Sequence, residues 1–202
     1  MASEAKGCGF DPRRMHQGWI PGPHFPMKLA SFEAIVSALN AADVKFIVVG
    51  GVAVNAHGYL RFTKDVDLVI RLSPQEIISA FHALEQIDYH PSNPISAEEF
   101  ADREKREGWR REKRMLVLKM WSDAHRETPL DIFVYEPFDF DVEYERALFN
   151  EDEIPARFAS IPALIAMKQI ANRPEDRIDI EKLRLIGDIP ADESERNAAA
   201  GD

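Results

Sequence analysis

The feature that most constrains the fold is a short apolar run that ends in two glycines. Residues 46–49 read Phe-Ile-Val-Val, and Gly50 and Gly51 follow at once. Such a run predicts a buried strand. The glycines let the backbone approach a ligand closely and leave free N–H groups for the phosphates of a nucleotide, at the start of a helix expected at about residues 52–57. The turn is not a Walker A loop, because no Gly-Lys-Ser or Gly-Lys-Thr follows it.

A pair of carboxylates marks the next expected strand, at about residues 65–71. Asp65 and Asp67 alternate with apolar residues, so their side chains point to one face, roughly 7 Å apart. Two ionised carboxylates at that spacing repel each other, and the cation expected between them is one that prefers oxygen ligands, Mg²⁺ or Mn²⁺. If the strand begins early, Arg61 and Thr63 share this face and add a cation and a hydroxyl for phosphate.

A third carboxylate, Asp131, lies in another apolar run and predicts chemistry on an acceptor hydroxyl. In a two-metal scheme it helps to deprotonate the attacking group. One alternative is a salt bridge with Lys119 or Arg126 across an expected hairpin. A second is that Asp139 or Asp141 supplies the third carboxylate.

Strand and helix patterns interleave along the rest of the chain. They predict an α/β (α+β) fold, a small mixed β-sheet flanked by helices. The expected helices open at Ser31, Ser73, Ser160 and Pro174, and the expected antiparallel pair covers residues 115–121 and 130–135.

Composition bounds the organisation and the partners. We expect an N-terminal tail over residues 1–27, one domain over 28–190 and a disordered C-terminal tail over 191–202. A net charge of -10 argues against a protein that coats nucleic acid non-specifically. Cys8 is the single cysteine, which excludes an intramolecular disulfide and favours a cytoplasmic location. No run of 18 apolar residues occurs, so no membrane association is expected.

One basic stretch stands apart from this acidic background. Residues 103–114 hold seven basic residues against three glutamates, with Trp109 in the middle. The first interpretation is a solvated helix face with internal ion pairs. The second is a surface, from Arg103 to Arg114, that binds an RNA acceptor, with its phosphates on basic side chains and a base stacked on Trp109.

The order of these motifs resembles that of the DNA polymerase β-type nucleotidyltransferase superfamily. The glycine pair, a gap of thirteen residues, the Asp-Val-Asp triplet and a separate Asp131 carry the resemblance. Residues 50–67 are most similar to its small bacterial branch, which includes the abortive-infection toxin-like nucleotidyltransferases. A late Leu-Ile-Ala-Met-Lys segment ending at Lys168, followed by Arg173-Pro174, is also similar. The resemblance covers about residues 29–187.

This resemblance implies a nucleotidyltransferase fold and a site. Gly50 and Gly51 would bind the triphosphate, the three carboxylates would bind two metal ions, and Lys168 would contact phosphate. Many relatives have serine where Gly51 stands. For Lys168 the alternative is a helix-edge lysine that extends to water.

We therefore expect a metal-dependent enzyme that moves a nucleoside monophosphate from an NTP to an acceptor hydroxyl and releases pyrophosphate. RNA, a protein or a small molecule is the expected acceptor. The resemblance also suggests a toxin–antitoxin or defence system and an antitoxin-like protein partner. The alternative is a catalytically silent nucleotide-binding regulator or partner subunit.

Overall fold

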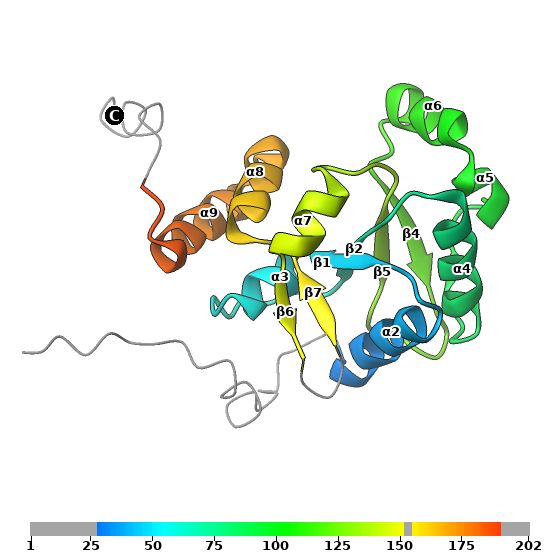
Figure 1. The fold of residues 1–202 in the computed structure, drawn as a ribbon, viewed down its shortest axis with the longest axis horizontal. Helices are drawn as coiled ribbons and strands as arrows, with labels where there is room; N and C mark the ends of the chain where they lie inside the picture. The colour runs from blue at the N-terminus through cyan, green and yellow to red at the C-terminus, as the bar shows by residue number, and fades with distance from the viewer. Residues whose placement is uncertain (1–27, 152–154, 191–202) are drawn as a thin grey trace, which may run out of the picture.

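The computed structural model describes residues 28–151 and 155–190 (Figure 1). Both expected tails lie outside the described residues. The helices are α2 (Leu29–Ala41), α3 (Gly50–Ala56), α4 (Pro74–Glu85), α5 (Ala97–Ala101), α6 (Arg103–Lys113), α7 (Phe140–Arg146), α8 (Ile161–Ala171) and α9 (Pro174–Gly187). The strands are β1 (Phe46–Val49), β2 (Val66–Ile70), β3 (His90–Pro91), β4 (Val117–Trp121), β5 (Leu130–Phe133), β6 (Leu148–Asn150) and β7 (Ala156–Phe158).

The strands form one mixed sheet in the order β3-β4-β5-β2-β1-β7-β6. Strands β2 and β5 run parallel, as do β1 and β7, and the other neighbours run antiparallel. The predicted fold class is therefore confirmed. The predicted strand at 46–49 and the antiparallel pair β4–β5 are confirmed as well. The predicted 65–71 strand is shorter, because β2 begins only at Val66.

The register places an apolar row of residues on one face of the sheet and a charged row on the other, at the centre of strands β2, β5 and β4. Paired residues on adjacent strands lie on the same face, and successive residues of one strand alternate between faces. Leu68, Ile132 and Leu118 are aligned across β2, β5 and β4, and all three are fully buried. The next aligned row, on the opposite face, is Asp67, Asp131 and Lys119. The sheet itself therefore brings two of the predicted carboxylates together.

Helix ends follow the predicted local signals with one exception. The Ser73 side chain accepts a hydrogen bond from the Glu76 N–H with Pro74 in the first turn, and Ser160 caps α8 in the same way. The prediction that Ser31 opens a helix was wrong, because α2 begins at Leu29. Ser31 is buried inside the helix, and its Oγ lies 2.9 Å from Nδ1 of His125 in the loop between β4 and β5.

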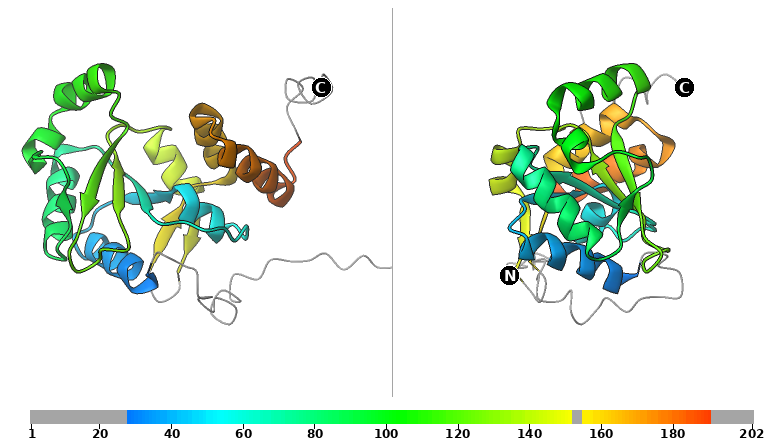
Figure 2. Two further views of the ribbon diagram at one scale, coloured as in Figure 1. Left: turned by 180° about the vertical axis from the view of Figure 1, so that it is seen from behind. Right: turned by 90° about the vertical axis from the view of Figure 1, so that its right-hand side faces the viewer.

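The remaining helices lie at opposite ends of the molecule. Helices α8 and α9 pack against each other at one end, and α5 and α6 lie at the other (Figure 1; Figure 2). Helix α3 begins at Gly50 and follows β1 directly. Of the helices in residues 28–151 and 155–190, none is both long and apolar enough to cross a membrane.

Candidate active site

The two glycines lie where neighbouring side chains leave no room for a Cβ atom. Gly50 has φ +64°, and a Cβ atom built on it would overlap Oδ2 of Asp67. A Cβ on Gly51 would lie 2.5 Å from Oγ1 of Thr63 and 2.9 Å from Nη2 of Arg61. Real side chains do not approach this closely, and the left-handed backbone at Gly50 also favours glycine. The bare turn is therefore packed directly against a carboxylate, a hydroxyl and a guanidinium.

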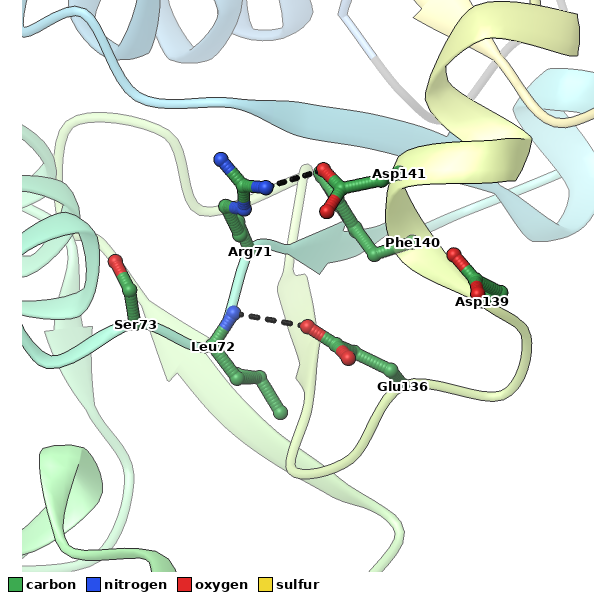
Figure 3. A pocket seen from close by; sticks show the side chains of 7 residues that line it. All are labelled: Arg71, Leu72, Ser73, Glu136, Asp139, Phe140 and Asp141. Atoms are coloured by element: carbon green, nitrogen blue, oxygen red, sulfur yellow. Dashed lines mark hydrogen bonds and ion pairs between the residues drawn. The ribbon is translucent and has the colours of Figure 1, made fainter.

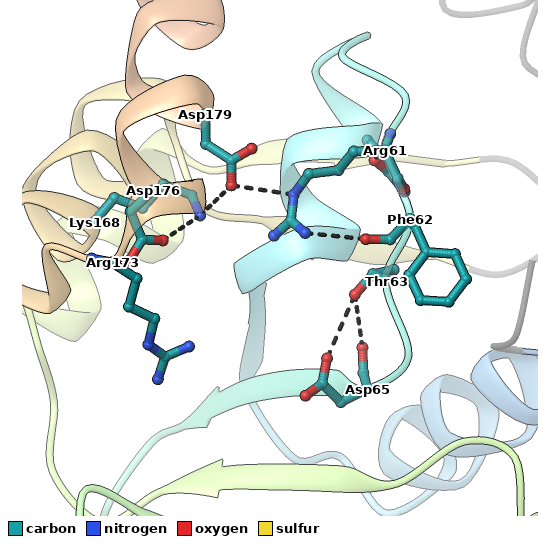
Figure 4. Close-up of polar contacts among 9 residues, drawn as sticks. Arg61, Phe62, Thr63, Asp65, Lys168, Arg173, Asp176 and Asp179 are labelled. Atoms are coloured by element: carbon teal, nitrogen blue, oxygen red, sulfur yellow. Dashed lines mark hydrogen bonds and ion pairs between the residues drawn. The ribbon is translucent and has the colours of Figure 1, made fainter.

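Arg61 and Thr63 reach the site from a loop and not from a strand, which corrects one expectation. Since β2 begins at Val66, they do not share a strand face with the acids. Asn55 fixes the loop instead: its Nδ2 donates to the Arg61 carbonyl at 3.0 Å, and its Oδ1 accepts from the Arg61 N–H at 2.9 Å. The Gly-Gly turn then gives both side chains a surface to pack on (Figure 4).

The three predicted carboxylates converge at one end of β2 and β5. Asp67 is paired in register with Asp131, and Asp65 immediately precedes β2 with its Oδ1 3.5 Å from Thr63 Oγ1. Burial, and then the charges of Asp65 and Asp131, raise the pKa of Asp67 to about 7. Burial also raises the pKa of Asp131, which the Lys119 ammonium, 4.0 Å away, partly opposes. Negative charge is therefore concentrated here without full compensation.

This donor set suits an oxygen-preferring cation in its chemistry. A divalent cation would relieve the repulsion that raises the pKa of Asp67. The described residues nevertheless contain no group of three His, Cys, Asp or Glu side chains arranged to hold a metal ion. Asp65 lies against Thr63 and Asp131 lies near Lys119. The side chains thus provide suitable ligands but not a preformed three-ligand centre.

The alternative third carboxylates, Asp139 and Asp141, lie elsewhere. They line a separate pocket together with Arg71, Leu72, Ser73, Glu136 and Phe140, beyond the opposite ends of β2 and β5 (Figure 3). Asp141 forms an ion pair with Arg71, and Asp139 caps α7 by accepting from the Val142 N–H at 3.1 Å. Asp131 is the carboxylate that the sheet places beside Asp67.

Lys168 belongs to a buried ionic network, so the alternative interpretation, that it extends to water, is wrong. Its Nζ lies 3.1 Å from Oδ1 of Asp176 and 2.5 Å from Oδ2 of Asp179. Lys168, Asp176 and Asp179 are respectively 6%, 6% and 1% exposed. Asp179 also pairs with Arg61, whose Nε is 3.1 Å away (Figure 4). The network ties α8 and α9 to the loop that packs on the glycine turn.

Arg173 is a candidate that sequence reasoning missed. It precedes α9, and its guanidinium points away from Asp176 and Asp179 (Figure 4). It is exposed, and no ion pair holds it among the residues that the structure describes. Its charge, like that of Lys168, lowers the pKa of Asp67, so it lies within electrostatic range of that carboxylate. The available signal was an arginine directly before the helix-starting Pro174.

The basic stretch forms α6, and its side chains have internal partners. Arg106 is buried and donates to the Phe100 carbonyl, and the Arg110 guanidinium lies 4.0 Å from the ring centre of Tyr135. The Trp109 ring is half-buried, 6.4 Å from that of Phe100. Exposed ion pairs within α6, Arg103 with Glu107 and Arg111 with Glu112, agree with the solvated-helix interpretation, and RNA binding by this surface stays a prediction.

Comparisons with known proteins bear on the fold. No family model and no curated protein matches this sequence. Among solved structures, the lincosamide antibiotic adenylyltransferase LnuA, bound to lincomycin, is similar with a TM-score of 0.51 at 16% identity, over 79% of this chain and 98% of that chain. The fold is the nucleotidyltransferase fold.

Two further solved structures are similar with lower TM-scores. An antigenic nucleotidyltransferase-like protein from Paracoccidioides brasiliensis has a TM-score of 0.48 at 15% identity, over 76% of this chain and 73% of that chain. The antibiotic-resistance factor ANT(2'')-Ia has a TM-score of 0.48 at 14% identity, over 85% of this chain and 95% of that chain. With TM-scores below 0.5, these two likenesses add nothing to the fold assignment.

Proposed function

We propose that this protein is a metal-dependent nucleotidyltransferase that moves a nucleoside monophosphate from an NTP to an acceptor hydroxyl and releases pyrophosphate. The observation that carries the proposal is the position of Asp67, which packs against the Gly50 backbone and pairs in register with Asp131. A bare turn for phosphates and two neighbouring carboxylates are the parts that this chemistry requires. The nucleotidyltransferase fold supports the proposal.

The triphosphate half of the site is the glycine turn with its surrounding cations. Gly50 and Gly51 carry no side chains of their own, and Asp67, Thr63 and Arg61 pack directly against them, so a carboxylate, a hydroxyl and a cation meet at the turn. Among the residues that the structure describes, Arg173 is exposed, lies within electrostatic range of Asp67 and takes part in no ion pair, so we assign it the direct contact with phosphate oxygens. Lys168 supports the site indirectly and does not contact phosphate, because its ammonium is buried between two carboxylates. Asp65 and Asp67 would hold the nucleotide-bound metal ion.

The acceptor half is centred on Asp131. The acceptor oxygen attacks the α-phosphorus, its proton passes to Asp131, and the bond from the α-phosphorus to the bridging oxygen breaks as pyrophosphate leaves. A raised pKa suits Asp131 to accept that proton. A divalent cation bound between the carboxylates would supply charge neutralisation and a lowered pKa of the acceptor hydroxyl.

The proposal is tested by Asp131→Asn, with Asp139→Asn as the matched control. Because Asp131 serves the acceptor, turnover is expected to fall about 100-fold or more while Mg-NTP affinity stays within about tenfold. Asp139 only caps α7, and asparagine caps equally well, so its variant keeps full turnover. Single-turnover transfer and equilibrium NTP binding are the measurements. Unchanged turnover in Asp131→Asn would remove this residue from the mechanism.

The role of Arg173 is tested separately by Arg173→Ala. Loss of one charge-assisted phosphate contact is expected to weaken Mg-NTP binding about tenfold or more without changing Tm. Arg177→Ala, an exposed arginine on the same helix, is the control. Equal affinities for the two variants would exclude a phosphate contact at Arg173.

The toxin-like setting and the antitoxin-like partner stay predictions from the resemblance. Expression of the chain alone in a bacterial host tests them. Growth arrest that Asp67→Asn abolishes is the expected result, and normal growth with an active enzyme would contradict it.

A further inference from the structure

An exposed indole lies on the same sheet face as the proposed catalytic carboxylate. In β4, Leu118 and Met120 are buried, whereas Lys119 and Trp121 point to the other face and are exposed. Lys119 is the direct cross-strand neighbour of Asp131, so Trp121 lies on the Asp131 face, one pleat further along β4. Trp121 is 47% exposed, in contrast to the half-buried Trp109.

Strand β3 supplies a second ring on this face. His90 pairs with Trp121 in register, and the two ring centres lie 6.1 Å apart at an interplanar angle of 53°. The His90 Nε2 lies 3.4 Å from Oδ1 of Asp88, and that carboxylate is itself held by the N–H groups of Asp123 and Ala124. The imidazole is therefore positioned by a fixed partner.

These residues differ in position from the basic helix α6. Helix α6 leads into the start of β4 at Val117, whereas Trp121 ends that strand. The end of β4 lies beside the start of β5, where Asp131 is found, because the two strands run antiparallel. The Trp121 ring is therefore on the acceptor side of the proposed reaction centre.

We propose that Trp121, His90 and Lys119, here called the indole platform, bind the acceptor and that the acceptor is a nucleotide unit. This inference rests on the proposed function. The base stacks on Trp121, as bases do on exposed aromatic rings in single-strand-binding proteins. Its phosphate is placed by Lys119, whose side chain is 71% exposed and whose Nζ is 4.0 Å from Asp131 Oδ2. The nucleotide hydroxyl then lies beside the proton acceptor.

The combination of groups argues for a nucleotide over a plain sugar. A sugar ring also packs on indole, but an uncharged sugar offers no anion to the Lys119 ammonium, whose side chain is 71% exposed and which reaches Asp131 only at 4.0 Å. A nucleotide uses the ring and the ammonium together. The source is either a free mononucleotide or the 3′ end of an RNA strand, which share this chemistry.

The test measures binding of a fluorescein-labelled ten-nucleotide RNA with a free 3′ hydroxyl, and its competition by AMP and by maltose. Trp121→Ala is expected to weaken RNA binding about tenfold or more, and Trp121→Phe to restore most of it, because phenylalanine also stacks. Lys119→Gln should weaken binding and lower the salt slope by about one. Trp109→Phe is the matched control and should leave binding unchanged.

The outcomes assign the source and separate this inference from the proposed function. If AMP competes with the RNA and the competition depends on Trp121, the acceptor is a free nucleotide. If AMP does not displace the bound RNA, the acceptor is the 3′ end of an RNA strand. Equal RNA affinity of wild type and Trp121→Ala, displacement by maltose, or a Trp121 fluorescence shielded from iodide in the free protein would overturn the inference. Mg-NTP binding should be unaffected by Trp121→Ala. If instead wild type fails to bind Mg-NTP while Trp121-dependent RNA binding persists, the proposed function fails and the platform stands.

Discussion

Two charged regions of this protein differ in the number of their charges and, more importantly, in how deeply those charges are buried. Helix α6 carries the densest run of basic residues, and most of its ion pairs are exposed: the side chains of Arg103 and Glu107 are 83% and 63% accessible. The network of Lys168, Asp176 and Asp179 on α8 and α9 has few charges, and they are almost completely buried. The second region is distinguished by charges that are both buried and paired, and not by the number of its charges.

The difference follows from the cost of desolvation. An exposed ion pair contributes little because water and salt screen it. Buried charges cost several kcal/mol each unless they are paired, so such a network persists only where every charge has its partner. In this protein the buried network also fixes the position of Arg61. Asp179 pairs with both Lys168 and Arg61, and Arg61 packs on Gly51.

The largest effect is expected from Lys168→Met. Methionine leaves Asp176 and Asp179 buried without their ammonium, which should lower the free energy of unfolding by about 3–5 kcal/mol. Thermal unfolding should show a Tm roughly 10 °C lower. Lys182→Met, on α9 with a partly exposed pair to Glu181, is the control and should change Tm little. Equal Tm values for the two variants would remove the distinction between buried and exposed pairs.

A smaller effect is expected from Asp67→Asn without metal. The pKa of Asp67 is raised to about 7, well above the ordinary value of an aspartate, so the folded state prefers the protonated form. The stability that this preference gives is present below pH about 4 and is lost as the pH rises toward 7. In EDTA, the asparagine variant should therefore have a Tm several degrees higher than wild type at pH 8, and a nearly equal Tm at pH 4. A difference independent of pH would show that charge repulsion at Asp67 is not its cause.

The smallest effect is expected on α6. Arg111→Gln removes an exposed pair with Glu112, so Tm should change by less than about 1 °C. NTP affinity and transfer should also be unchanged. A transfer rate more than fivefold lower would show that the exposed charges of α6 take part in the reaction, contrary to the distinction drawn between the two regions.

Much of the fold was predictable because its signals are local. The apolar run of β1, the alternation around Asp67 and the Pro174 helix start are each read within a few residues. The pairing of Asp67 with Asp131 was not readable, since the register between β2 and β5 joins residues far apart in sequence. The Lys168 network could not be predicted because it depends on how α8 packs against α9 and on Arg61, which is distant in sequence. The prediction of a helix start at Ser31 was wrong because the Ser31 hydroxyl bonds to His125, which is distant in sequence, and not to the end of its own helix.

The site shows the same limit. The glycines and acids were identified from spacing, but the reason for Gly51 is the packing of Thr63 and Arg61, which only the folded loop reveals. Basic residues surround Trp109 in the sequence, whereas Trp121 ends the strand expected over residues 115–121, where no local signal marks it as exposed. The two indole rings differ in how exposed they are and in the sheet face on which Trp121 lies, and neither property can be read from the neighbouring residues in sequence.

The central claim is nucleotidyl transfer, and α-labelled NTPs test it most directly. Wild type and the Asp65→Asn/Asp67→Asn double variant would be incubated with each NTP, Mg²⁺ or Mn²⁺, and a cell extract. The account predicts label in RNA, protein or a small molecule with wild type alone. Label appearing equally with both proteins, or neither transfer nor metal-dependent NTP binding by wild type, would contradict it.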